Sequence, residues 1–251
     1  MKKIKLFSWA MMALMCLSFS GCGATSGSEG DTITQLMLAK FDSHSTSLTD
    51  INGTKLIPSD PSVLYTLTEP GIYQFTVAYD PNTVSDGQVK VTFNSEPTSI
   101  MNPFGVIPEE DFIKDYNIPL YAIDYQPRQL APFMFDANYM IIPVVYQSPS
   151  IVNDSEINTE LGKHRFVLSY DTPQTGDDTL VLHLSDKVTD VEKERSLARF
   201  TFQAFDLSSL ISYFKAQGNT LKKITVKGLT SDASSDLADA KEETYTFDYN
   251  F

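Results

Sequence analysis

Apolar and polar residues alternate along several segments of this chain, which is the pattern of β-strands with one buried face. The clearest alternation covers 73–79, 199–203 and 245–251, where large aromatic or aliphatic side chains occupy every second position. Shorter stretches with the same period occur at 34–39, 89–93, 139–146, 165–170, 179–184 and 223–227. The pattern therefore predicts β structure in both halves of the chain.

Residues that favour tight turns separate these segments. Asn52-Gly53 accepts the positive φ angles of a hairpin, Pro70-Gly71 leads into the strand at 73–79, and Asp86-Gly87 precedes the strand at 89–93. We therefore expect hairpins to follow one another in the first half of the chain.

One segment, 207–217, has the period of a helix instead. Its apolar residues lie three and four positions apart, at Leu207, Leu210, Ile211 and Phe214. Asp206 can cap the N-terminus of such a helix, and Gly218 stands where a left-handed residue ends one. The sequence predicts one short helix here, with its apolar stripe on the core.

The alternation lapses in a proline-containing stretch that predicts a domain boundary. We interpret 97–108 as a linker between an N-terminal unit at 32–96 and a C-terminal unit at 109–251. The first unit has the length of a five-stranded barrel, and the second has the length of a two-layer β-sandwich.

The N-terminus carries an export signal. Lys2, Lys3 and Lys5 precede an uncharged run at 6–19 that is too short to span a membrane but suits a secretory signal. Phe19-Ser20-Gly21-Cys22 resembles the lipobox at which bacterial lipoproteins are cleaved and acylated, which implies a lipid on Cys22. We expect a signal peptide at 1–21 and a flexible, Gly- and Ser-rich tether at 22–31.

Composition and charge narrow the possible partners. Apolar residues make up 42% of the chain, which is enough for packed cores. The 32 acidic residues outnumber the 19 basic residues, giving a formal net charge of -13, so nucleic acid is not expected as a partner. Cys16 leaves with the signal peptide, so the mature chain has no second thiol for a disulfide with Cys22.

The order of these features resembles a known family. The turn at 50–56, the strand start at 69–73, Phe205-Asp206-Leu207 and the terminal Tyr-x-Phe-x-Tyr strand together resemble the NigD-like lipoproteins of Bacteroides-type bacteria. The resemblance implies an all-β protein in which a small OB-like barrel is followed by a β-sandwich with one short helix. It also suggests an envelope- or immunity-associated role, and it offers no active site to carry over.

The carboxylates and histidines of the sequence show no spacing that is typical of a catalytic or metal site. The acidic runs at 109–111 and 177–178 are interpreted as solvated surface, because adjacent residues seldom converge as a catalytic pair. The three histidines, His44, His164 and His183, lie in different segments without the close pair that is usual in a zinc site. We therefore expect no metal site, and we interpret His183 as an outward-facing strand residue.

Two other segments resemble functional motifs only in part. The oxygen-rich loop at 80–87 lacks the ligand spacing of an EF-hand and is interpreted as a hairpin. Ser212-x-x-Lys215 lies in the C-terminal part of the predicted helix, whereas the same motif of penicillin-recognising enzymes lies at the start of a helix. The sequence therefore predicts a protein that is not an enzyme and needs no cofactor.

Aromatic residues are the most promising ligand contacts, because sugar rings stack on aromatic faces. The candidates are Tyr121, Tyr125, Tyr139 and Tyr146. We expect a lipid-anchored binding or interaction module of the cell envelope, held at the outer membrane through Cys22 on its periplasmic or surface face, with a protein or glycan partner. The alternative is a carbohydrate-binding accessory lipoprotein of a polysaccharide-uptake system.

Overall fold

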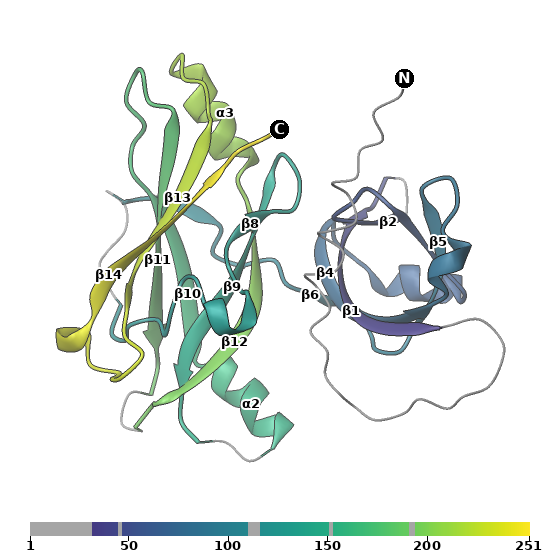
Figure 1. The fold of residues 1–251 in the computed structure, drawn as a ribbon, viewed down its shortest axis with the longest axis horizontal. Helices are drawn as coiled ribbons and strands as arrows, with labels where there is room; N and C mark the ends of the chain where they lie inside the picture. Colours follow the sequence, from purple (N-terminus) through teal and green to yellow (C-terminus); the bar gives the residue numbers. More distant parts are fainter. Residues whose placement is uncertain (1–31, 45–46, 110–115, 151–152, 191–193) are drawn as a thin grey trace. The chain divides into compact units, whose positions relative to one another are not determined.

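The computed structural model describes residues 32–44, 47–109, 116–150, 153–190 and 194–251 (Figure 1). The chain divides into two compact units between Ile100 and Met101, and strands dominate both. None of the helices among the described residues is long and apolar enough to cross a membrane. The expected signal peptide, the tether at 22–31 and Cys22 lie outside the described residues.

The N-terminal unit is a five-stranded mixed β-barrel. The strands run in the order β1-β2-β3-β5-β4, and β1 also pairs with β4, so the sheet closes on itself (Figure 1). The pair β3–β5 is parallel, and the other barrel pairs are antiparallel. This is the strand order of an OB fold, so the predicted OB-like barrel is confirmed. The elements are β1 (Ile33–Asp42), β2 (Ser47–Asp50), β3 (Lys55–Pro58), β4 (Gly71–Tyr79), β5 (Gln88–Phe93), the added strand β6 (Thr98–Ser99), and the 3-10 helices η1 (Pro61–Thr66) and η2 (Pro81–Thr83).

The turn between β2 and β3 shows how the local sequence shapes the barrel. Asp50 Oδ1 accepts hydrogen bonds from the backbone N–H groups of Asn52 and Thr54, both at 2.8 Å. Gly53 has a φ of +79°, which a side chain would disfavour. The Asn-Gly hairpin that the sequence predicts is therefore present, and it positions Leu48 and Leu56 in register in the barrel core.

The C-terminal unit contains two sheets. One has five strands in the order β14-β13-β11-β10-β7, and the other has three in the order β12-β9-β8. The pairs β7–β10 and β11–β13 are parallel. The elements are β7 (Val106–Pro108), η4 (Gln126–Arg128), β8 (Phe133–Met134), β9 (Tyr139–Ser148), α2 (Asp154–Leu161), β10 (His164–Tyr170), β11 (Thr179–Val188), β12 (Leu197–Asp206), α3 (Ser208–Ala216), β13 (Lys223–Thr230), η5 (Leu237–Asp239) and β14 (Lys241–Asp248).

The main core lies between these two sheets. Leu182 and Leu184 of β11 belong to the same buried cluster as Ile142 and Val144 of β9. Since side chains alternate across a strand, every second residue of β11 points into this core and the others point to the opposite side of the sheet. The predicted β-sandwich is confirmed.

The helix content differs from the prediction of one short helix. The predicted helix at 207–217 is present as α3, which buries Leu210 and Phe214 and is followed by Gly218 with a φ of +83°. A second helix, α2, precedes β10 and was not expected. It begins where Asn153 Oδ1 accepts a hydrogen bond from the N–H of Glu156 at 3.0 Å.

The expected linker at 97–108 carries two short strands. Its first part contains β6, which pairs with β4, and its last part is β7, which pairs with β10. Between them Asn102 is buried, and its Nδ2 donates to the carbonyl of Phe166 at 3.1 Å and to Gln203 Oε1 at 3.0 Å. Pro108 ends an edge strand, where a missing N–H is tolerated.

Candidate functional site

The outer face of the five-stranded sheet, meaning the face opposite the core, carries the candidate site. His183 of β11 points to this face, as the alternation of the strand predicts. A cavity of about 200 Å³ lies here, and its lining includes Glu109, Tyr116, Ser169, His183 and Glu242.

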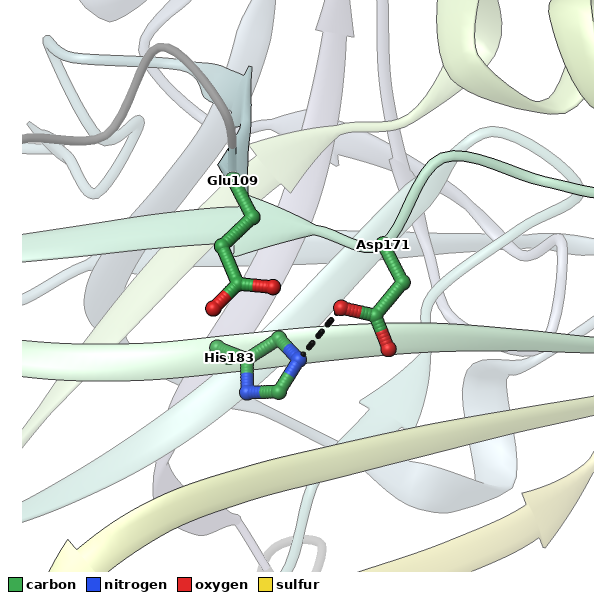
Figure 2. A group of neighbouring side chains, drawn as sticks. All are labelled: Glu109, Asp171 and His183. Carbon is green, nitrogen blue, oxygen red and sulfur yellow. Dashed lines mark hydrogen bonds and ion pairs between the residues drawn. The ribbon is translucent and has the colours of Figure 1, made fainter.

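Three side chains from separate segments converge beside this cavity, and two of them, Glu109 and His183, line it. Glu109, Asp171 and His183 each offer one nitrogen or oxygen atom within 4.8 Å of the other two, and Figure 2 shows their polar ends pointing toward one another. His183 Nε2 lies 2.8 Å from Asp171 Oδ1. The side chains of His183 and Asp171 are 27% and 43% exposed, so the group is accessible from solvent.

Strand register explains why these residues meet. β7 pairs in parallel with β10 and aligns Pro108 with Tyr170, so the next residues along, Glu109 and Asp171, leave the sheet side by side. β10 pairs with β11 in antiparallel register and aligns Ser169 with His183. Asp171 lies two residues beyond Ser169, which keeps it on the face of His183.

The arrangement can hold a cation. Two carboxylates that face each other at this range repel unless a proton or a positive ion lies between them. One imidazole nitrogen and two carboxylate oxygens are also donors that Zn²⁺ and related divalent ions accept. The expectation of no metal site rested on the lack of a close pair of ligands in sequence. The candidate donors here come from β11 and from the residues that follow β7 and β10, and the alternation does not reveal how these strands pair.

The core-facing side of the same sheet holds a second polar group, which we call the Arg195 cluster: Glu160, Lys163, His164, Asp186 and Arg195. The side chain of Arg195 is 1% exposed, and its Nη1 donates to Glu160 Oε1. His164 Nδ1 lies 2.7 Å from Asp186 Oδ2, and both side chains are fully buried. The side chains of Arg195, His164 and Asp186 are buried, whereas that of Lys163 is 24% exposed, so the cluster supports the fold from the interior.

The surroundings of these groups shift several pKa values. Burial raises the pKa of the Glu160 carboxyl, but hydrogen bonds from Arg195 and Lys163 outweigh burial and hold that pKa below its ordinary value. Burial raises the pKa of Asp186 despite the hydrogen bond to His164. Burial also raises the pKa of Tyr146, which packs beside this cluster, to about 12.

The four candidate tyrosines do not share one groove. Tyr121 and Tyr125 form a perpendicular ring pair with centroids 5.7 Å apart, and both are half-buried. Tyr146 is 1% exposed and packs 5.8 Å from the ring of Phe166, so it is a core residue and not a surface contact. Tyr139 begins β9, about 20 Å along the strand from the part of β9 that binds the backbone of Tyr121.

Comparison with known proteins identifies solved structures that share this fold. No family model matches the sequence, and no curated protein matches it either. A crystal structure of a protein from Bacteroides fragilis, described as a putative lipoprotein, has a TM-score of 0.74 and 25% sequence identity, and the match covers 87% of this chain and 99% of that chain. The chain shares the fold of this Bacteroides protein.

Other solved structures have lower similarity. A protein of unknown function, DUF1344, from Bacteroides vulgatus has 15% identity and a TM-score of 0.54, with 88% of this chain and 92% of that chain covered. A NigD-like immunity protein from Bacteroides caccae has 14% identity and a TM-score of 0.46, with 88% and 99% covered. The first two structures confirm the predicted resemblance at the level of the fold, and a NigD-like protein is among the neighbours.

Proposed function

We propose that this protein is a lipid-anchored protein of the cell envelope that acts as a non-catalytic binding module. The observation that carries the proposal is the likeness, over almost the whole of both chains, to a Bacteroides protein described as a putative lipoprotein. The sequence supports the proposal, because the signal peptide predicted at 1–21 is followed by Cys22 in a lipobox-like context.

A lipid anchor would determine how the module works. One acyl chain binds a membrane weakly and reversibly, whereas a multiply acylated cysteine holds a protein there stably. Anchoring then raises the concentration of the module near partners at the same membrane. The proposed location is the outer membrane, and the proposed partners are envelope proteins or glycans.

Lipidation is tested by expressing the whole chain in a Bacteroides host that is fed alkyne-tagged palmitate. Wild-type protein is expected to take up the label and to sediment with membranes, whereas Cys22→Ser abolishes both. Cys16→Ser is the matched control, because it removes the other thiol of the chain without touching the acylation site. Labelling that persists in Cys22→Ser, or a wild-type chain that gains no lipid mass, would refute the proposal.

A carbohydrate-binding accessory role is a second candidate, and the Tyr121–Tyr125 pair favours it. The two rings lie perpendicular and half-buried, and Asp124, which lies between them in sequence, accepts a hydrogen bond from Gln126. An aromatic face next to a carboxylate suits a sugar ring, which presents C–H groups on its faces and hydroxyls at its edge.

This candidate predicts a measurable loss of glycan binding. Calorimetry with purified polysaccharide should show binding to the wild type that falls at least about tenfold in Tyr121→Ala/Tyr125→Ala, the effect of losing about 1.4 kcal/mol. Tyr213→Ala is the control, since Tyr213 is 39% exposed on α3. Equal binding by all three proteins would exclude the tyrosine pair as the contact.

A further inference from the structure

We propose that Glu109, Asp171 and His183 form a binding site for a divalent transition-metal cation of the zinc type. The proposal goes beyond the lipid-anchored role and does not depend on it. It rests on three donor atoms within 4.8 Å of one another, two of them on residues that line a cavity (Figure 2).

The geometry requires small movements of the donor atoms in opposite directions. Zinc binds imidazole nitrogen and carboxylate oxygen at about 2.0–2.2 Å, which places the donor atoms of a tetrahedral site about 3.4 Å apart. The Nε2–Oδ1 distance of 2.8 Å between His183 and Asp171 is shorter than this, so these two atoms have to move apart by about 0.6 Å. Glu109 follows a short edge strand and has a flexible side chain, so it can close the remaining distance.

A bound ion would take the place of the proton that His183 and Asp171 now share. The shared hydrogen bond requires a proton between Nε2 and Oδ1, whereas a metal uses the lone pairs of both atoms. A zinc ion is larger than the proton that it replaces, so Nε2 and Oδ1 have to separate from 2.8 Å to about 3.4 Å. Rotation of the Asp171 side chain, which is 43% exposed, can provide this movement.

The local charge also favours a cation. Two carboxylates face one imidazole, and Glu242 lines the same cavity. Lys227 is the register partner of His183 on β13 and supplies a single positive charge nearby. The acidic groups therefore outnumber the basic ones around the cavity, which attracts a divalent ion.

The donor set indicates the class of ion. Calcium and magnesium prefer all-oxygen ligands, and copper(I) prefers sulfur, whereas one nitrogen with two oxygens suits zinc and its neighbours. Three protein ligands leave a coordination position open, and the cavity of about 200 Å³ has room for water there. The site is therefore suited to exchangeable binding and differs from a closed four-ligand structural site.

The test uses the purified whole chain in mild detergent with both Cys16→Ser and Cys22→Ser, so that no thiol competes for the metal. Titration with zinc, and with cobalt(II) as a spectroscopic probe, should show one ion per chain. His183→Ala, Asp171→Asn and Glu109→Gln should each weaken binding at least about tenfold, as expected for the loss of a ligand contact.

A matched control comes from the other unit. His44 lies 3.4 Å from Asp42 with its side chain 96% exposed, which makes it a histidine–carboxylate pair outside the proposed site. His44→Ala should leave the zinc affinity unchanged. Circular dichroism of each variant reports the fold, and the near-isosteric Glu109→Gln tests the site even if His183→Ala unfolds.

The proposal is overturned if the whole chain binds no zinc at 100-fold molar excess, or if His183→Ala and Glu109→Gln bind it as tightly as the parent. A result of this kind leaves the lipid anchor untouched, because the anchor is measured on Cys22 in a separate experiment. Failure of palmitate labelling likewise leaves the metal site standing.

Discussion

Arg195 is the largest fully buried side chain of the described residues, at 1% exposure. A buried guanidinium is costly unless a carboxylate and further acceptors surround it. Here Glu160 supplies the carboxylate, and the carbonyl oxygen of Asp190 accepts from Nη2 at 2.6 Å. Lys163 Nζ lies 3.2 Å from Glu160 on the other side. Glu160 is thus the residue that satisfies two cations where α2 leads into β10.

Removing this carboxylate should be strongly destabilising. Glu160→Gln removes the carboxylate that pairs with the buried Arg195, which we expect to lower the free energy of unfolding by about 3 kcal/mol. Urea denaturation at pH 7 measures the change. Glu156→Gln is the control, because Glu156 is an exposed acid on the same helix. An equal effect of the two substitutions would contradict a special role for Glu160.

The same residue predicts a pH dependence. Burial raises the pKa of folded Glu160, but the hydrogen bonds from Arg195 and Lys163 outweigh burial and hold that pKa below its ordinary value. A lowered pKa in the folded state stabilises the protein above the unfolded pKa, and this contribution is lost as the pH falls through the folded pKa. The wild type should therefore lose more stability than Glu160→Gln between pH 6 and pH 3. Parallel pH profiles of the two proteins would count against this assignment.

At the scale of elements, Gly228 in β13 allows the sandwich to pack closely. A Cβ at this position would lie 2.9 Å from the carbonyl oxygen of Leu184, with the side chains of Leu120 and Ile123 at 3.1 and 3.2 Å. The first of these neighbours is backbone and cannot move aside cheaply. The absence of a side chain at Gly228 therefore determines how closely β13 approaches β11 and the segment around Leu120. The sequence alone gives no sign of this role.

Gly228→Ala should consequently overpack the sheet and lower the free energy of unfolding by about 1–3 kcal/mol. The control is Gly162→Ala at the end of α2, where a Cβ meets only ordinary contacts at 3.5 Å. Thermal unfolding followed by circular dichroism should show a lower midpoint for Gly228→Ala alone. If both variants have the same unfolding midpoint as the wild type, the close approach at β13 does not exclude a side chain at position 228.

The periodicity of apolar residues correctly predicted those elements whose apolar residues form one continuous face that packs on the core. The strand at 73–79 appears within β4 and the helix at 207–217 appears as α3, because each has a continuous apolar face. The helix α2 was missed, since Ile157 and Leu161 are its only apolar residues. An apolar stripe of two residues is too weak to indicate a helix.

The candidate site shows a different limit of sequence reasoning. The outward direction of His183 followed from alternation, but its two partners depended on which strands pair. The pairing of β7 with β10 is parallel and joins segments far apart in the chain, so no hairpin turn in the sequence indicates it. Likewise, Tyr146 was predicted to be a ligand contact because of its aromatic ring, but it is buried in the structure. The alternation of residues does not show which faces of β9 other elements cover.

At the scale of the whole molecule, the two units have separate cores. The barrel core contains Phe75, which is 1% exposed with its ring 4.7 Å from that of Phe93. The sandwich core contains Phe166 and Leu182 and shares no buried residue with the barrel core. A unit with its own core can lose stability without the other.

Core truncations should therefore act on one unit at a time. Phe75→Ala is expected to cost about 3–5 kcal/mol in the barrel. Hydrogen exchange followed by mass spectrometry should show lost protection in β1–β5 and unchanged protection in β10–β14. Phe166→Ala is the reciprocal control and should reverse this pattern. Equal loss of protection across both units in either variant would show that they unfold together.

The closure of the barrel by β1 and β4 also has a consequence for self-association. Each of the five barrel strands has a neighbour on both sides, so an incoming chain finds no open backbone edge there to extend. Strand addition has to begin elsewhere, for instance at β14, the last strand of the five-stranded sheet. That strand begins with Lys241, Glu242 and Glu243, and charged residues at such an edge oppose the stacking of copies into aggregates. Neutral residues at these three positions are therefore expected to increase the association of copies through β14 at high protein concentration.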